Sequence, residues 1–99
     1  MAVHTVQLTV STAGDTDVID LTARVQGLID RLGVTAGQAL AFVRGSTAAL
    51  TTMEYEPGGV HDLQEAFERL VPTDGDYEHN RLNHDSNSHA HQRAYRSPS

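Results

Sequence analysis

The sequence contains no cysteine and no tryptophan, and all seven of its basic residues are arginine. Without cysteine the chain cannot form a disulfide framework, a thiolate nucleophile or a cysteine-type zinc finger. Without lysine it cannot form a Schiff base with a carbonyl substrate. Aromatic residues make up only 5% of the 99 positions. A chain this short buries a small hydrophobic core, so we expect it to need a partner or a metal for full stability.

Positive charge and long apolar runs are also scarce. Thirteen acidic against seven basic residues give a formal charge of −6, which argues against binding to a phosphate backbone. No apolar run approaches the roughly 20 residues of a membrane span. The N-terminus lacks the basic and apolar regions of a secretory signal. We therefore expect a cytoplasmic protein with no nucleic-acid partner and no membrane partner.

Three segments of the sequence have the patterns of β-strands. Residues 3–10 alternate in side-chain character and are rich in β-branched residues. Residues 39–43 form a short continuous apolar run, and residues 47–55 follow after a small turn at Gly45. Alternation and short apolar runs are typical of strands. The sequence thus predicts three strands within a single domain spanning residues 1–99.

Two further segments have the three-to-four residue spacing of amphipathic helices. The first runs from about Asp17 to Leu32, with Gly33 placed as the residue after a helix end. The second runs to Leu70 and is stopped by Pro72, after a turn at residues 57–59 ends the preceding strand. The expected order is strand, helix, strand, strand, helix.

The last part of the chain, residues 73–99, is polar and rich in histidine. Four of the six histidines lie within thirteen positions: His79, His84, His89 and His91. By composition alone this segment is predicted to be a loop or a disordered tail.

Within that segment, four side chains that can bind metal or substrate alternate with small residues: Asp85, Asn87, His89 and His91. On an extended backbone alternate side chains point the same way, so two imidazoles and a carboxylate could chelate one divalent metal. Zinc is the metal that this donor set favours. On a helix, Asp85 would lie one turn before His89 and Asn87 one turn before His91. Only one histidine would then reach a given metal. The alternative is a solvated histidine pair with no function.

Three other residues, in two places, could have functional roles, and each place also has a purely structural interpretation. Glu54 lies at the end of a predicted strand and could be a general base or a metal ligand. The alternative is a surface carboxylate. Ser46 and Thr47 lie in a small hydroxylated turn that could hold a phosphate. The alternative is a turn with no ligand.

Two blocks of the sequence, taken in order, are similar to a known family. They are the Gly45-Ser46-Thr47-Ala48-Ala49 block, which continues to Glu54, and the block Asp85-x-Asn87-x-His89-x-His91. Together with the Gly14-Asp15-Thr16 opening they resemble the YjbQ family, small proteins described as secondary thiamine-phosphate synthases. The resemblance covers nearly the whole chain.

The resemblance implies an α+β fold, a β-sandwich of antiparallel sheets with two main helices, that assembles as a homotrimer. It also implies a divalent metal and a reaction that joins a pyrimidine pyrophosphate to a thiazole phosphate. The residues that it suggests for the site are His89 and His91 as metal ligands with Asp85 as a third, Glu54 and Asn87 as catalytic residues, and Ser46 and Thr47 as phosphate-binding residues.

The sequence departs from the family pattern in two places. Some relatives have histidine where this chain has Gly45, and the family continues with further strands where this chain ends at Ser97-Pro98-Ser99. We therefore expect a domain that lacks its C-terminal strands. Two alternatives to an enzyme follow. One is a trimeric metal- or ligand-binding protein without catalysis, and the other is an inactive, truncated family member.

Overall fold

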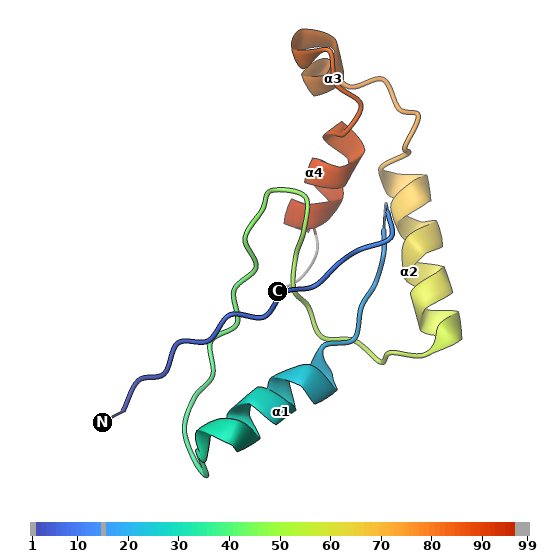
Figure 1. Ribbon diagram of the computed structural model, residues 1–99. Helices are drawn as coiled ribbons and strands as arrows, with labels where there is room; N and C mark the ends of the chain where they lie inside the picture. The colour runs from blue at the N-terminus through green and yellow to red at the C-terminus, as the bar shows by residue number, and fades with distance from the viewer. Residues whose placement is uncertain (1, 15, 97–99) are drawn as a thin grey trace. The chain divides into compact units, whose positions relative to one another are not determined.

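The computed structural model describes residues 2–14 and 16–96, which form four helices and no strand (Figure 1). The helices are α1 (Thr22–Leu32), α2 (Pro57–Leu70), α3 (Glu78–Asn83) and α4 (Ser88–Arg96). The chain divides into two compact units, residues 1–40 and 41–99. None of the described helices is long and apolar enough to cross a bilayer. Asp15 of the opening motif and the Ser97-Pro98-Ser99 ending lie outside the described residues.

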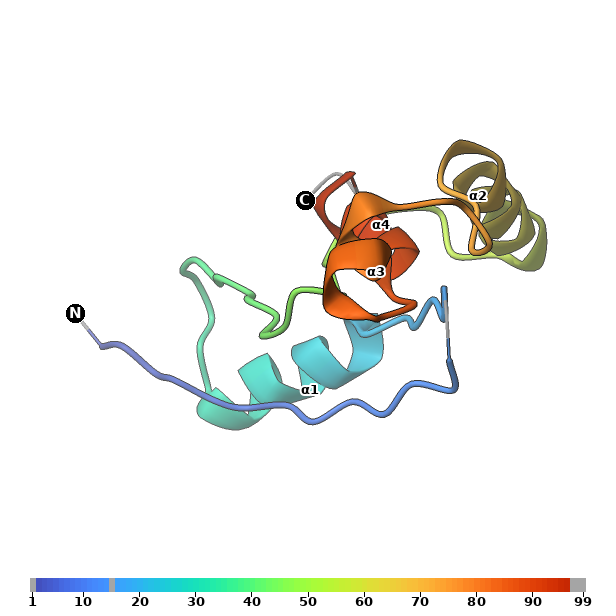
Figure 2. The same ribbon diagram turned by 90° about the horizontal axis from the view of Figure 1, so that it is seen from above.

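The prediction of a β-sandwich is wrong for the part of the chain that the structure describes. Residues 3–10, 39–43 and 47–55 follow irregular paths and form no strands (Figure 2). Leu40 is 97% exposed and Phe42 82% exposed. An alternating pattern makes a segment suitable for a strand, but a strand also needs hydrogen-bond partners from a second segment. No such pairing forms here among the described residues.

The first predicted helix is confirmed as α1, although it begins at Thr22 and not near Asp17. The Asp20 carboxylate accepts a 2.9 Å hydrogen bond from the Thr22 backbone N–H. Hydrogen bonds from the Thr22 side chain and backbone lower the pKa of Asp20. The helix ends as expected at Gly33, whose φ of 70° is a left-handed conformation. Arg24 Nη2 donates to the Thr9 carbonyl at 2.8 Å, which ties α1 to the extended segment before it.

The second predicted helix is confirmed as α2, but it begins earlier than the sequence suggests. The predicted turn at residues 57–59 is in fact the first turn of the helix, with Pro57 at its start. The Glu56 carboxylate caps this turn by accepting the backbone N–H groups of Gly58 and Gly59. A Cβ at position 59 would lie 2.9 Å from Glu56 Oε1, so glycine leaves the room that this cap needs. Residues 57–59 therefore form a helical turn, capped by Glu56, although their sequence is typical of a turn between two elements.

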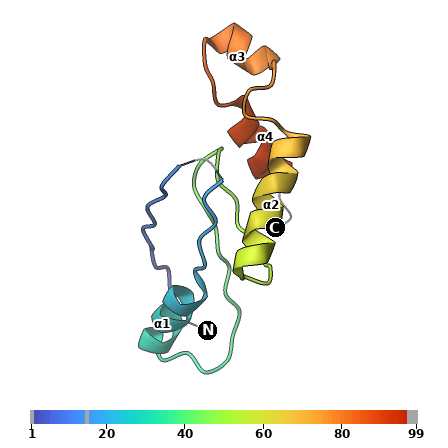
Figure 3. The same ribbon diagram turned by 90° about the vertical axis from the view of Figure 1, so that its right-hand side faces the viewer.

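The prediction of a loop or disordered tail is wrong for most of residues 73–96, which contain α3 and α4. α3 ends at His84, which adopts a left-handed conformation with φ 51° and donates its N–H to the Asn80 carbonyl. Figure 3 shows the short connection that leads from α3 into α4. Composition predicted disorder because it counts apolar residues and overlooks hydrogen bonds of this kind.

The centre of the second unit is a buried arginine. Arg93 of α4 is 7% exposed and donates to the Val71 carbonyl from Nε at 3.1 Å and from Nη2 at 2.7 Å. The same Nη2 lies 2.7 Å from the Glu68 carboxylate and 3.3 Å from Thr73 Oγ1. Val71 is the one buried hydrophobic residue among those described, at 2% exposure. These contacts fasten α4 to the segment at the end of α2.

Candidate functional site

Four residues of the second unit form a group that we call the histidine cluster: Ser46, His79, Asn87 and His91. His79 Nε2 lies 2.9 Å from Asn87 Oδ1, and His91 Nδ1 lies 3.1 Å from the Ser46 carbonyl oxygen. The two imidazole rings meet edge to face, with centroids 5.0 Å apart and planes at 68°. Both histidines are partly buried. The cluster thus joins α3, α4 and the turn that contains Ser46.

The connection between α3 and α4 positions the cluster. Asn80 of α3 accepts the backbone N–H of Ser88 through its side-chain oxygen at 3.0 Å. The Asn87 carbonyl accepts the N–H groups of Ala90 and His91, which starts the first turn of α4. Asn87 therefore begins α4 with its backbone and contacts α3 with its side chain. Because these bonds join residues that are close in sequence, a few residues determine how α4 is oriented relative to α3.

The hydrogen bonds of the two histidines indicate how their protons are placed. A backbone carbonyl can only accept, so Nδ1 of His91 donates to Ser46 and Nε2 of the neutral ring carries the lone pair. Asn87 Oδ1 is likewise an acceptor, so His79 donates from Nε2 and its lone pair is on Nδ1. Histidines that bind metals usually donate their other ring N–H to a carbonyl or carboxylate in this way.

The spacing of the two rings also fits a shared cation. A metal 2.0–2.1 Å from an imidazole nitrogen lies about 3.2 Å from the ring centroid, and a tetrahedral angle then separates two centroids by about 5.2 Å. The observed separation of the His79 and His91 centroids is 5.0 Å. The donor set of two imidazoles suits zinc and similar transition metals. The separation of the two rings is therefore close to that of a two-histidine site, and it equally matches a direct edge-to-face contact between the rings.

The predicted metal ligands are not all brought together. His89 and His91 both lie on α4, where two positions correspond to a rotation of about 200°, so their side chains leave different faces of the helix. His89 is 3% exposed, whereas Asp85 is exposed and accepts the Ser86 backbone N–H at 2.8 Å. This arrangement is the one expected if the segment is helical, in which only one of the two histidines reaches a given metal. Among the described residues, no group of three or more His, Asp or Glu side chains close enough to hold a metal includes Asp85, His89 or His91.

The other predicted site residues lie in exposed turns or irregular segments. Ser46 contacts His91 through its backbone carbonyl and not through its hydroxyl. Thr47 follows it in the same exposed turn, and Glu54 is exposed on an irregular segment. The roles proposed for the Ser46 hydroxyl, Thr47 and Glu54 stay predictions.

Sequence reasoning missed His79, which had no role in any motif. It lies eight positions before Asn87, a distance at which no helix or strand periodicity pairs two side chains. The signal that could have found it is the Asn80-Arg81-Leu82-Asn83-His84 run, since Asn and His tolerate the left-handed backbone that ends α3 at His84. A chain reversal there brings residues before and after it into contact.

Comparison with known sequences identifies one family. A family model described as "UPF0047 protein YjbQ-like" matches residues 6–97. A UPF0047 protein of Methanothermobacter thermautotrophicus is 33% identical over 89 residues, which cover 90% of this chain and 62% of the relative. A UPF0047 protein of Archaeoglobus fulgidus is 36% identical over 88 residues, which cover 89% of this chain and 66% of the relative. The aligned region of this chain thus spans less than two thirds of either relative. No solved structure matches the chain.

Proposed function

The chain belongs to the UPF0047 (YjbQ-like) family, and on this basis we propose that it binds a divalent transition metal through His79 and His91 and acts on a phosphorylated small molecule. The observation that supports the metal site is the pairing of each imidazole N–H with a carbonyl acceptor, Asn87 Oδ1 or the Ser46 carbonyl. That pairing leaves one lone pair on each neutral ring.

In this proposal each residue of the histidine cluster has a defined task. His79 and His91 supply the two nitrogen ligands, and Asn87 and the Ser46 carbonyl hold the rings in orientation and tautomer. Two protein ligands leave coordination positions for water or for substrate oxygens. Zinc is the expected metal because imidazole ligands suit it better than they suit magnesium or calcium.

The reaction that we propose is of the thiamine-phosphate synthase type. The thiazole nitrogen attacks the methylene carbon of a pyrimidine pyrophosphate, a carbon–nitrogen bond forms, and the carbon–oxygen bond to pyrophosphate breaks. A bound cation would neutralise charge on the departing pyrophosphate. Glu54 remains a candidate acid or base, the turn at Ser46 and Thr47 a candidate phosphate site, and a homotrimer the proposed assembly.

The metal site is tested by isothermal titration of the full chain with zinc. We expect His91→Gln and His79→Gln each to weaken zinc binding at the cluster by roughly tenfold or more, since each removes one of two protein ligands. His4→Gln is the matched control, because His4 is an exposed histidine of the other unit. Equal zinc affinity in wild type, His79→Gln and His91→Gln would contradict the proposal.

The catalytic part is tested separately by thiamine-phosphate formation with and without a chelator. An enzyme of this type should lose turnover when the metal is removed and in His91→Gln. If zinc binds at the cluster but no product forms, the chain is a metal-binding protein without this activity, and the reaction is disproved while the site stands.

A further inference from the structure

A second group of metal-binding side chains lies on α2, away from the histidine cluster. His61 Nδ1 is 3.4 Å from Asp62 Oδ1 and 3.9 Å from Glu65 Oε2. One ligand atom from each of these three residues lies within 4.8 Å of the others. All three side chains are exposed, at 72%, 82% and 56%. From this arrangement we propose that His61, Asp62 and Glu65 form a surface site for a divalent transition cation.

The distances between donor atoms match those of a coordination sphere. With metal–nitrogen and metal–oxygen bonds of 2.0–2.2 Å, two ligands of a tetrahedral zinc lie about 3.3–3.5 Å apart. The His61–Asp62 distance of 3.4 Å falls within this interval, and the His61–Glu65 distance of 3.9 Å exceeds it by a few tenths of an ångström. Exposed side chains can close such a gap by small rotations. One imidazole and two carboxylates suit zinc, nickel or cobalt.

The backbone of α2 holds His61 and Glu65 close together before any cation binds. Residues four apart on a helix face the same side, so His61 and Glu65 are neighbours by construction. The first turn of α2 is held by Pro57 and by the Glu56 carboxylate, which accepts two backbone N–H groups. His61 follows directly after this capped turn. Little further order is needed to bring its imidazole against Glu65.

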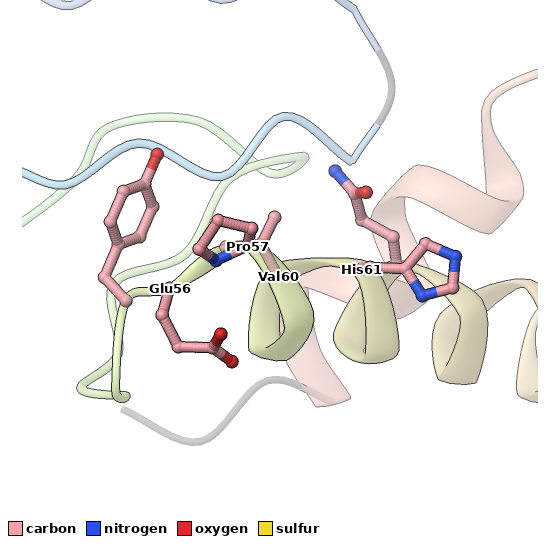
Figure 4. Close-up of a pocket in the computed structure, with 6 residues that line it drawn as sticks. Glu56, Pro57, Val60 and His61 are labelled. Carbon is pink, nitrogen blue, oxygen red and sulfur yellow. The ribbon is translucent and has the colours of Figure 1, made fainter.

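A pocket lies beside this group and shares His61 with it. It has a volume of about 260 Å³ and is lined by Tyr55, Glu56, Pro57, Val60, His61 and Gln64. Figure 4 shows His61 on α2 beyond Val60, with Glu56 near the beginning of the helix. His61 therefore belongs both to the metal-binding group and to the pocket wall. A cation held by three protein ligands keeps open positions that water or an oxyanion in this pocket could fill.

Without a cation, these contacts are a hydrogen bond from His61 Nδ1–H to Asp62 or, when the imidazole is protonated, ion pairs with Asp62 and Glu65. Such exposed pairs contribute little to stability. The two interpretations differ in what they predict for added metal, because a cation competes with the proton for the His61 nitrogen.

The test is nuclear magnetic resonance of the full chain titrated with nickel alone. A paramagnetic ion broadens nearby resonances, so we expect broadening of the backbone amides around His61, Asp62 and Glu65. In His61→Gln this broadening should disappear at the same nickel concentration. In Glu65→Gln the apparent affinity should fall by roughly tenfold. His84→Asn is the matched control, because it removes an exposed histidine and asparagine tolerates the left-handed backbone there.

Two outcomes would overturn the site on α2. One is broadening confined to residues 79–91 with none on α2, and the other is unchanged α2 broadening in His61→Gln. Because the readout is position-specific, failure of this site is distinguishable from failure of the histidine cluster, whose test is the loss of zinc binding in His79→Gln and His91→Gln.

Discussion

Polar side chains, more than apolar ones, occupy the buried positions that the structure describes. Beside Val71, the buried residues are Ser88, His89 and Arg93. A buried guanidinium is costly unless its donors are paired, and Arg93 donates from Nε and Nη2 to the Val71 carbonyl, Glu68 and Thr73. The position of α4 therefore depends on charge-assisted hydrogen bonds, which are directional, and only slightly on apolar contact.

These bonds make the second unit sensitive to acid. The hydrogen bond from Arg93, followed by those from Thr73, lowers the pKa of Glu68 from 4.5 to about 2. Because the folded pKa is below the unfolded one, the stabilisation is complete above about pH 4.5 and is lost as the pH falls towards 2. We expect Glu68→Gln to lower the urea midpoint, followed by circular dichroism, at pH 6 and to have much less effect at pH 2.5.

The control for this measurement is Glu54→Gln, which removes an exposed carboxylate from an irregular segment. It should leave the midpoint nearly unchanged at both pH values. If Glu68→Gln shifted the midpoint equally at pH 6 and pH 2.5, the ion pair with Arg93 would not be the source of the stabilisation.

The ends of α1 and α2 are set by residues close in sequence, and this is why both long helices were predictable. The apolar spacing of α1 and the glycine after it can be read from residues 18–33 alone, and Pro72 limits α2 in the same way. The start of α2 was misplaced because Pro57-Gly58-Gly59 is also a common turn sequence. The Glu56 cap decides between the two, and glutamate is not a usual residue at this position.

The glycine inside α1 and the glycine directly after it should respond to substitution in opposite directions. Gly27 lies inside the helix, and a Cβ there would meet nothing within 4 Å. Gly27→Ala should therefore stabilise α1 by about 0.5–1 kcal/mol. Gly33 has a φ of 70°, so Gly33→Ala should destabilise the helix end by about 1 kcal/mol.

Thermal unfolding followed by circular dichroism at 222 nm measures both effects, and each variant serves as the control for the other. A shift of both variants in the same direction would mean that α1 is not the helix described.

For the whole chain, the sequence indicates a family but not the described fold. Strand-like segments such as residues 3–10 need a pairing partner that is distant in sequence, and local pattern contains no information on whether that partner is present. The histidine cluster was predicted only in part, because one of its residues is also brought in by a contact that local pattern does not reveal. Asn87 and His91 stand out by their motif, whereas His79 joins them only through the reversal at His84.

Exposed apolar side chains suggest that the chain associates with copies of itself. Leu40, Phe42 and Val3 are 97%, 82% and 83% exposed, and covering such surface is favourable. We expect sedimentation velocity to show an average mass that rises with concentration above the 10.7 kDa of one chain, towards the proposed trimer. Phe42→Ser should weaken this association by roughly tenfold or more, since burial of a phenylalanine is worth about 1.5–3 kcal/mol.

Thr51→Ser is the control for the association, because Thr51 is exposed and small. A constant mass of one chain at every concentration would refute the proposed self-association.

The left-handed residue at His84 has a further consequence for how this region can change in evolution. A residue added or removed between His84 and Ser88 would change the length of a connection that is held at one end by the left-handed His84 and at the other by the hydrogen bond from the Ser88 N–H to Asn80 Oδ1, and would displace the start of α4. His91 would then leave His79, and Arg93 would leave Glu68 and the Val71 carbonyl at the same time. The length of this connection should therefore tolerate no insertions or deletions, even where the identity of Ser86 is free to vary.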